Sequence, residues 1–370
     1  MLIDTLTIII GSTLLLLAIL TPLLSAFFRR PRIESAYDNG ERPGFSIVIP
    51  VHDNAPELQR NLPALLQQNY EGGSYEVIVV DESSTDDTEE VLKLLKQEYQ
   101  HLYSTYIPAS SHYLSRRKLS LTIGVKAAKY EWVIFTEADC IPEDDTWLTT
   151  LAAHCTADTD AVCGYTGYED DAKLFHRFER LQANCHLLGH PYRYEGCNLA
   201  IRKQVFMQSN GFLKNLMYLR GEYDFLVNEW ERVSVMTVPE GRMRQESPSH
   251  KQWANKHLYW METRRHLRHT FVPRLLWYLD TACLHLNYLL QVAVMAFAAF
   301  KQNYILLGVT AFCLLLTMTL RIIFAKRAAR DFGEKLPALA VPFLELRVLW
   351  SDLRFWVRHR LADKYDFIRK

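Results

Sequence analysis

Short apolar runs alternate with amphipathic segments between residues 43 and 142, and this alternation is the strongest constraint on the fold. Runs rich in valine, isoleucine and phenylalanine are typical of buried strands, whereas leucines three and four residues apart indicate helices packed on one face. We expect strands over residues 45–50, 76–81, 103–107 and 132–136, separated by helices over residues 57–68, 87–99 and 118–129. This order predicts an α/β fold with a doubly wound, mostly parallel sheet.

The order becomes less regular beyond residue 142. We expect strands over residues 161–165 and 195–201, and helices over residues 172–188, 222–232 and 255–269. The last of these helices mixes aromatic residues with arginines, which suits a membrane–water boundary.

Three apolar stretches flank the α/β region, over residues 2–28, 275–300 and 304–324. At ~1.5 Å per residue each is long enough to cross a hydrocarbon core of ~30 Å. A cleaved signal peptide is the alternative for the first stretch, but the basic residues Arg29, Arg30 and Arg32 follow the apolar run instead of preceding it. Basic residues on that side place the following domain in the cytoplasm. The three residues between the other two stretches require an antiparallel hairpin with both ends in the cytoplasm.

A fourth apolar segment, residues 336–350, is short and contains two prolines, Glu345 and Arg347. We expect it to lie in the membrane interface or to re-enter it. The predicted organisation is an N-terminal anchor (1–28), a cytoplasmic catalytic domain (43–270), a transmembrane hairpin (275–324) and an interfacial or cytoplasmic tail (325–370). The protein is expected to be a multi-pass protein of the cytoplasmic (inner) membrane.

The charge composition gives no sign of a nucleic-acid or acidic partner. Lys and Arg total 42 and Asp and Glu also total 42, so no basic excess points to a nucleic-acid partner. The seven cysteines show no C-x-x-C spacing, which favours reduced thiols in a cytosolic compartment.

The segment Trp132–Pro142 places two carboxylates at the end of a predicted strand. Glu137 and Asp139 follow the apolar run with one residue between them. In open α/β sheets ligands bind at the carboxyl ends of the strands, and two such carboxylates can share a divalent cation that also binds phosphate oxygens. An acidic turn without function is the alternative. The earlier strand 76–81 ends at Asp81, and a polar turn from Ser83 to Asp87 follows it. Together the two strand ends indicate a nucleotide pocket.

Four segments in this order, FSIVIPV, VIVVDESSTDDT, KLSLTIGVKAAKY and EWVIFTEADCIP, closely resemble the family 2 glycosyltransferases. That family has the nucleotide-diphospho-sugar GT-A fold, and the resemblance extends over about residues 45 to 260. It implies an enzyme that transfers a hexosyl or N-acetylhexosaminyl group from a nucleotide sugar, with a UDP-sugar as the expected donor.

The resemblance also implies a set of donor-binding residues: Pro50 and Val51 beside the base, Asp81 and Ser83 near it, Lys118 toward the nucleotide, and Glu137, Ala138 and Asp139 at the diphosphate. Asp139 would bind Mn²⁺ or Mg²⁺, with Glu137 in place of the usual first aspartate. A divalent cation suits the chemistry because the diphosphate leaving group gains negative charge as its bond to the sugar breaks.

An acceptor hydroxyl must also lose a proton, which requires a carboxylate base. The family usually has a Glu-Asp pair here, but Tyr223 follows Glu222 and the next carboxylate is Asp224. Residues two apart in a helix point about 200° from one another, so we expect only one of these carboxylates to face the acceptor. Either can be the base, and a structural role at a helix N-terminus is the alternative for both.

Two further segments resemble ligand-contacting parts of the family. Gly196 and Asn198 would line the sugar pocket, with Cys197 between them structural. Lys251, Trp253, Lys256 and Trp260 lie where many membrane synthases have Q-x-x-R-W, and are expected on the acceptor and diphosphate side. Only the tryptophan of that motif is retained, which argues against processive synthesis.

The leading hypothesis is an inverting, metal-dependent glycosyltransferase that acts on a lipid-linked or cell-envelope glycan. A short-chain processive polysaccharide synthase is the second reading. A catalytically silent sugar-nucleotide-binding partner of an envelope enzyme is the third, supported only by the altered Glu-Asp pair.

Overall fold

Seven strands form the central sheet of the computed structural model, which describes residues 5–30, 42–109, 114–188, 191–268, 270–363 and 366–367. Their order across the sheet is β3-β2-β1-β4-β8-β6-β9. The bounds are β1 Phe45–Val51, β2 Tyr75–Asp81, β3 Leu102–Tyr106, β4 Trp132–Phe135, β6 Ala161–Gly164, β8 Leu199–Arg202 and β9 Val233–Met236. The first four are parallel to one another, whereas β8 runs antiparallel to both β4 and β6. The predicted doubly wound, mostly parallel α/β sheet is therefore confirmed.

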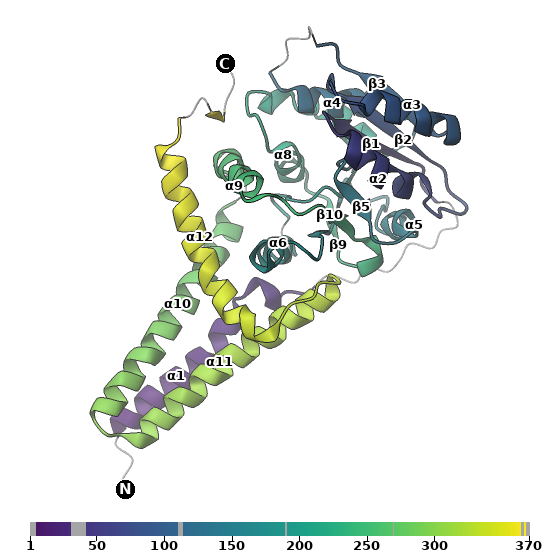
Figure 1. Ribbon diagram of the computed structural model, residues 1–370. Coiled ribbons are helices and arrows are strands. Elements are labelled where there is room, and N and C mark those ends of the chain that lie inside the picture. Colours follow the sequence, from purple (N-terminus) through teal and green to yellow (C-terminus); the bar gives the residue numbers. More distant parts are fainter. Residues whose placement is uncertain are drawn as a thin grey trace.

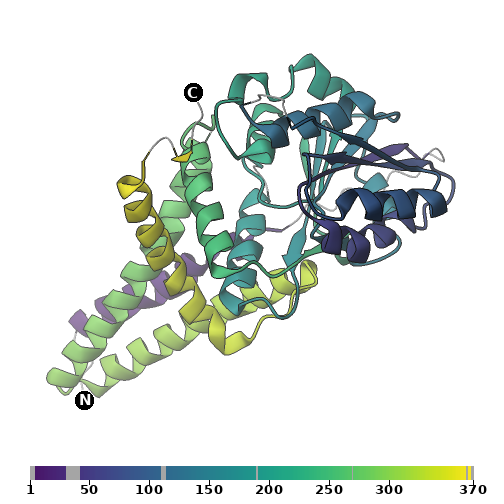
Figure 2. The same cartoon turned by 45° about the horizontal axis from the view of Figure 1, so that its top comes forward.

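Helices cover both faces of this sheet, as Figures 1 and 2 show. Alternate residues of β1 point to opposite faces: Ile47 and Ile49 pack with one set of helices and Val48 with the other. The first set comprises α2 Ala55–Leu66, α3 Thr88–Glu98 and α5 Trp147–Ala152. The second set comprises α4 Arg116–Ala127, α7 Lys203–Gln208 and α8 Glu222–Glu229. A strand buried on both faces reads as a continuous apolar run, which is why β1, β2 and β4 were predictable.

A second, smaller sheet lies at the carboxyl edge of the first. It consists of β5 Cys140–Pro142, β10 Met243–Gln245 and β7 Thr166–Tyr168, in that order. β10 pairs with β5 so that Gln245 lies opposite Cys140, the residue that follows Asp139. The short sheet thus connects the acidic end of β4 with a segment about a hundred residues later.

Three helices are long and apolar enough to cross a membrane, namely α1 Thr5–Leu23, α10 Phe271–Phe300 and α11 Tyr304–Asp331. They pack together as one bundle that projects from the α/β domain in Figure 1. Polar groups connect them inside the bundle, where the Asn287 amide donates to Thr21 Oγ1 at 3.1 Å and to Thr317 Oγ1 at 3.3 Å. The three predicted apolar helices are confirmed. Of the basic residues after the first, Arg32 lies outside the described residues.

The remaining helices lie between the sheet and the bundle. They are α6 Leu174–Leu187, α9 His250–Arg264 and α12 Val341–Leu361, with short 3₁₀ turns η1 Ala26–Phe28, η2 Leu213–Asn215, η3 Pro239–Gly241 and η4 Ala338–Ala340. α9 starts five residues before the predicted helix because Ser249 and Gln252 form a capping box. The strand expected over 195–201 forms only as β8. The apolar segment 336–350 contains η4 and the first part of the 21-residue α12, from Val341 to Trp350.

Candidate active site

Two adjoining cavities open at the carboxyl ends of the parallel strands. The larger has a volume of about 710 Å³ and reaches from Pro50 and Val51 to the acidic segment after β4. The smaller, of about 450 Å³, reaches from Gly196 to the first turn of α8. Residues that line both cavities mark their junction: Arg117, Glu137, Arg220, Gln245, Gln252, Lys256 and Tyr259. A ligand that crosses the junction can therefore contact both walls.

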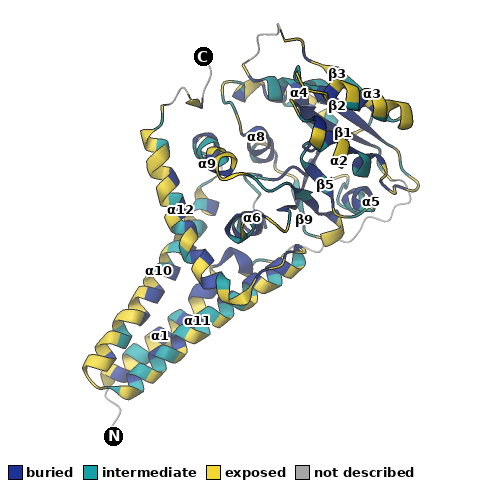
Figure 3. Cartoon of the chain, viewed as in Figure 1, coloured by how far each residue is buried: buried dark blue, intermediate teal, exposed yellow. Residues whose placement is uncertain are grey.

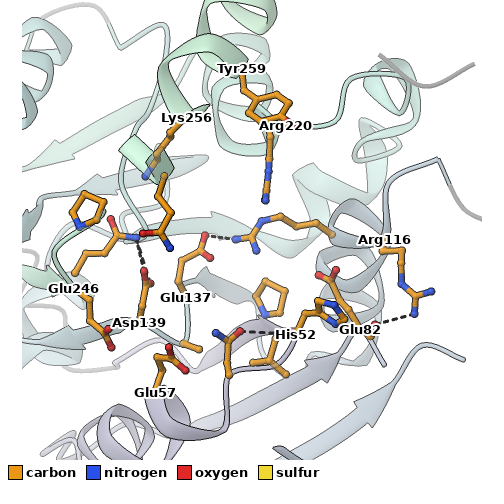
Figure 4. A pocket seen from close by; sticks show the side chains of 18 of the residues that line it. His52, Glu57, Glu82, Arg116, Glu137, Asp139, Arg220, Glu246, Lys256 and Tyr259 are labelled. Carbon is orange, nitrogen blue, oxygen red and sulfur yellow. Dashed lines mark hydrogen bonds and ion pairs between the residues drawn. The ribbon is translucent and has the colours of Figure 1, made fainter. Parts of the chain in front are cut away.

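Asp139 lies on the wall of the larger cavity, and Figure 4 shows it opposite Lys256. Its Oδ2 accepts a hydrogen bond from Gln245 Nε2 at 3.0 Å, and its Oδ1 accepts one from Cys140 Sγ at 3.4 Å. Burial raises the pKa of the Asp139 carboxyl, the neighbouring Glu137 raises it further, and Lys256 opposes the shift. Bound cationic charge would favour the ionised form.

Glu137 is held differently. Its Oε1 is paired with the Arg117 guanidinium and accepts a hydrogen bond from the Tyr223 hydroxyl at 3.3 Å. Tyr223 stands where the family usually has an aspartate, so in this chain that position helps to fix Glu137. Because Arg117 already neutralises Glu137, Asp139 is the carboxylate with more capacity to bind a cation.

The donor set fits a hard divalent cation of the Mg²⁺ or Mn²⁺ type. No group of three or more His, Cys, Asp or Glu side chains suited to a metal occurs among the described residues. Such cations are commonly held by one or two carboxylates, with substrate phosphates and water as the other ligands. Asp139, with Glu137 two residues before it, provides an arrangement of this kind.

Two further carboxylates, Glu222 and Asp224, line the smaller cavity. They belong to the first turn of α8, which follows Gly221 at φ +92°. A Cβ at Gly221 would approach Thr263 Cγ2 to 2.7 Å, so both the backbone angle and the space require glycine. Both carboxylates line the cavity, and the expectation that only one of them faces the acceptor stays a prediction.

Asp224 is the more rigidly held of the two. Its Oδ1 accepts a hydrogen bond from the Tyr194 backbone N–H at 2.8 Å, and its Oδ2 lies 3.5 Å from Arg264 Nε. Arg264 also pairs with the buried Glu195. Burial raises the pKa of Asp224, and Arg264 opposes that shift. In Glu222, Oε1 is buried and has no hydrogen-bond partner among the described residues.

Most of the predicted residues line these cavities. The larger has Pro50, Val51, Glu137, Ala138, Asp139 and Lys256 in its wall. The smaller has Gly196, Glu222, Asp224, Lys256 and Trp260.

The prediction for Lys118 is wrong in its geometry. The side chain is fully buried, and its Nζ donates to the backbone oxygens of Asn215 and Tyr218, each at 2.6 Å. Burial lowers the pKa of Lys118 to about 8. The neighbouring residues Arg116 and Arg117 line the larger cavity instead, because successive helical residues point about 100° apart.

Asn198 and Trp253 are also placed in the core instead of at a cavity. Asn198 Nδ2 donates to Gly241 O at 2.9 Å, and its Oδ1 accepts from Trp147 Nε1 at 3.3 Å. The Trp253 indole stacks on His176, with ring centroids 4.4 Å apart. Both side chains are therefore structural.

Three more predicted residues lie near the cavities without lining them. Asp81 accepts from the Ser84 hydroxyl at 2.6 Å, and Ser83 accepts from Arg116 at 2.8 Å. Their neighbour Glu82 lines the larger cavity instead. Lys251 is exposed on the first turn of α9 and lines neither cavity.

Sequence reasoning missed the cationic junction. Arg117 and Arg220 line both cavities, and Figure 4 shows the Arg220 side chain directed toward the guanidinium that binds Glu137. The pair Arg116–Arg117 beside Lys118 was a usable signal, as was Arg220 before Gly221. Gln245 carried no signal, because its position depends on the unpredicted small sheet.

A mostly parallel sheet with an acidic strand end beside a large polar cavity is the arrangement in which α/β domains bind ligands. Residues 46–214 match the family described as glycosyl transferase family 2. The chain therefore carries a glycosyltransferase family 2 domain with a GT-A-like fold.

Three comparisons place this domain among known proteins. Glycosyltransferase AglE of Haloferax volcanii is 29% identical over 106 residues, which cover 29% of this chain and 33% of the relative. Chondroitin synthase of Escherichia coli is 29% identical over 133 residues, 35% of this chain and 18% of the relative. The chain thus spans a third or less of these curated relatives. The solved structure of mannosyltransferase PcManGT from Pyrobaculum calidifontis, in complex with GDP-Man and Mn²⁺, has a TM-score of 0.54 at 16% identity, and covers 88% of this chain and 98% of that one.

Proposed function

We propose that this protein is a membrane-bound, inverting glycosyltransferase that moves a sugar from a nucleotide-diphosphate sugar to a lipid-linked or cell-envelope glycan. The observation that carries the proposal is the pair of joined cavities, with Asp139 in one, Asp224 in the other and Arg117, Arg220 and Lys256 at or near their junction. The nucleotide would lie in the larger cavity and the reacting sugar at the junction.

The junction suits the departure of a diphosphate. A divalent cation bound by Asp139, and by Glu137 in part, would act as a Lewis acid toward the leaving group. Arg220 and Lys256 supply fixed positive charge on the opposite side, where Figure 4 shows them. Preorganised charge of this kind stabilises the negative charge that develops in the transition state. The Pyrobaculum mannosyltransferase was solved with a nucleotide sugar and Mn²⁺, which supports a donor of this class.

Asp224 is the proposed base. The Tyr194 N–H and Arg264 fix its carboxylate, and Oδ2 has no hydrogen-bond partner among the described residues. A base works best when its pKa lies near the working pH, and burial moves the pKa of Asp224 upward in that direction. Asp224 would take the proton of the acceptor hydroxyl while that oxygen attacks the anomeric carbon from the face opposite the diphosphate. Inversion follows from this single displacement.

The three apolar helices support a membrane location. Basic residues near their ends, including Arg29, Arg30, Arg327 and Arg330, support a catalytic domain on the cytoplasmic side. An acceptor that is itself held in the membrane would meet such an enzyme without leaving the bilayer surface.

The test is release of nucleoside diphosphate by the full-length protein in lipid nanodiscs, with UDP-, GDP- and dTDP-sugars as donors. Each donor is supplied with Mn²⁺, with Mg²⁺ and with a chelator, in the presence of membrane lipid extract as acceptor. We expect metal-dependent turnover of one donor that is lost in Asp139→Asn and Asp224→Asn and largely kept in Glu222→Gln. Tight nucleotide binding without turnover of any donor would instead support the silent binding partner.

A further inference from the structure

Helix α12 has one buried face and one exposed apolar face. Leu344, Val348 and Phe355 are buried where α12 packs on α6, α9 and α11. The opposite side exposes Phe343 at 72%, Trp350 at 64% and Leu361 at 82%. We call the exposed side chains of Phe343, Trp350, Leu353, Trp356, Val357 and Leu361 the outer face of α12. Most of them are three, four or seven residues apart, the spacing of one side of a helix.

We expect another molecule to contact the outer face of α12 and to shield it from water. Soluble monomers rarely leave large contiguous apolar surfaces in water, and such surfaces mark contacts with proteins or membranes. Figure 3 shows the exposed side of α12 continuing along the helix past the end of the bundle. Two of the side chains are tryptophans, a residue type enriched at membrane–water interfaces.

Positive charge accompanies the apolar residues. Arg347, Arg354, Arg358 and Arg360 are exposed along α12, and none forms an ion pair with a described carboxylate. Arg354 and Arg360 instead lie over the rings of Phe355 and Trp356, at 5.1 and 4.7 Å from the centroids. Apolar side chains flanked by unpaired arginines match a layer that offers acyl chains and anionic phosphates together.

The position of α12 is fixed relative to the three candidate spans. Arg321 of α11 is buried, and its guanidinium binds Glu345 of α12 at 2.8 Å and Asp280 of α10 at 3.0 Å. Figure 1 shows α12 running across the bundle at the end that lies nearest the α/β domain. A membrane that holds α10 and α11 therefore also reaches α12.

We propose that the outer face of α12 lies in the headgroup layer of this membrane, with its aromatic rings at the acyl boundary and its arginines on the phosphates of anionic lipids. The proposal goes beyond sugar transfer and does not depend on it. It commits to lipid as the occupant of this surface, in preference to a second copy of the chain or another protein.

The buried face of α12 connects the lipid-facing helix with the candidate active site. His359 of α12 binds Glu262 of α9 with 2.9 Å between Nε2 and Oε2, and Phe355 stacks on His257 of α9 with centroids 4.8 Å apart. α9 also carries Lys256, which lines both cavities. α12 therefore packs directly on α9, the helix that forms part of the wall of the smaller cavity.

The experiment measures where a spin label at Leu353→Cys lies. The full-length protein is labelled in a Cys155→Ser, Cys283→Ser background, because the five other cysteines are buried. It is placed in nanodiscs of neutral lipid, or of neutral lipid mixed with phosphatidylglycerol. The matched control is a label at Leu94→Cys, an exposed leucine on α3 of the catalytic domain. Collisions with oxygen, which concentrates in lipid, are compared with collisions with a water-soluble nickel chelate.

We expect the label at 353 to favour oxygen several-fold over the label at 94, and more strongly when phosphatidylglycerol is present. Arg354→Gln with Arg358→Gln should remove the phosphatidylglycerol increment while nucleotide binding remains. Equal access of the chelate to both labels would overturn the proposal. The proposal would also be overturned if the 353 label is shielded from both reagents and if unlabelled Leu353→Cys protein, treated with a mild oxidant, forms a disulfide between two copies, because protein would then cover the surface.

Discussion

The walls of the two cavities are built in different ways. The larger cavity takes Val51, Glu137 and Asp139 from the ends of neighbouring parallel strands, so the hydrogen-bonded sheet itself sets their spacing. The smaller cavity takes Glu195 from a loop and Asp224 from α8, and both depend on Arg264 of α9 for their position. Backbone pairing therefore holds one wall, and buried charge pairs hold the other. Substitutions should remove function selectively in the first and disturb geometry and pH dependence in the second.

The largest effect is expected for Asp139→Asn. The change keeps the side-chain shape and removes the charge that would bind the cation, so turnover should fall about 1,000-fold, consistent with the several kcal/mol that a metal ion contributes. The melting temperature should stay close to that of the wild type, because the sheet and not Asp139 sets this wall. Nucleoside diphosphate release and thermal unfolding in nanodiscs measure both.

Asp158→Asn, an exposed carboxylate that lines neither cavity, is the matched control and should be fully active. If Asp139→Asn keeps its metal-dependent turnover, the cation binds elsewhere, and the wall of the larger cavity does not have the role that we assign to it.

Asp224→Asn should reduce kcat about 100- to 1,000-fold, the usual contribution of a general base, with nucleotide affinity unchanged. Because a base must be ionised, wild-type kcat should fall as the pH drops through the pKa of Asp224, which burial has raised. Steady-state rates at several pH values give kcat, and a separate nucleotide titration gives the affinity. An equal loss in Glu222→Gln would show that the two carboxylates act together, against the assignment of Asp224 alone.

Arg264→Gln tests how charge pairs hold the second wall. Arg264 lowers the pKa of Asp224, so its removal should raise that pKa and move the acidic limb of the kcat profile to higher pH. The loss of a partner for the buried Glu195 should also destabilise the fold by about 3 kcal/mol. We expect a loss of activity of about tenfold near neutral pH, since the chemistry stays intact but a smaller fraction of the base is ionised.

Arg264→Lys should restore part of the profile. Arg265→Gln, at an exposed neighbour paired with Glu262 at 3.7 Å, should have little effect because surface ion pairs contribute little. An unshifted acidic limb in Arg264→Gln would mean that Asp224 is not the group that titrates.

The same contrast explains what the sequence could predict. β1, β2 and β4 are buried over most of their length, so their apolar runs are continuous, and the residues that end them had to lie together at one edge. The small sheet was not predictable, because β5, β7 and β10 have three residues each and are too short to give a periodic signal. The contacts that it brings about also join residues far apart in sequence, such as Gln245 and Asp139.

The direction of the Lys118 side chain was predicted wrongly for a different reason. Family resemblance assigned a basic residue near the start of α4 to the nucleotide, and three basic residues follow one another there. Arg116 and Arg117 reach the cavity, whereas Lys118 turns into the core. Which of the three side chains faces the cavity depends on the residue at which the helix begins. Ser115 caps α4, and its hydroxyl accepts a hydrogen bond from the Lys118 backbone N–H at 3.3 Å.

The smallest effect on activity is therefore expected for Lys118→Met. The ammonium supports the backbone at Asn215 and Tyr218, so its loss should lower stability by about 1–3 kcal/mol, the cost of leaving buried acceptors unpaired. Burial lowers the pKa of Lys118 to about 8, below its ordinary value of 10.5, so between these values the unfolded chain binds a proton that the folded chain releases. Wild-type stability should rise with pH across that window, and Lys118→Met should lack this rise.

Arg117→Met is the matched comparison, because it removes a neighbouring cation that lines both cavities. It should weaken nucleotide-sugar affinity about tenfold, the effect of losing one charge-assisted contact, while Lys118→Met should change affinity less than about twofold. Chemical unfolding at several pH values and nucleotide titration of both variants give the result. If Lys118→Met weakens donor binding as much as Arg117→Met, the loop at 215–218 belongs to the wall of the larger cavity, and that wall is not set by the sheet alone.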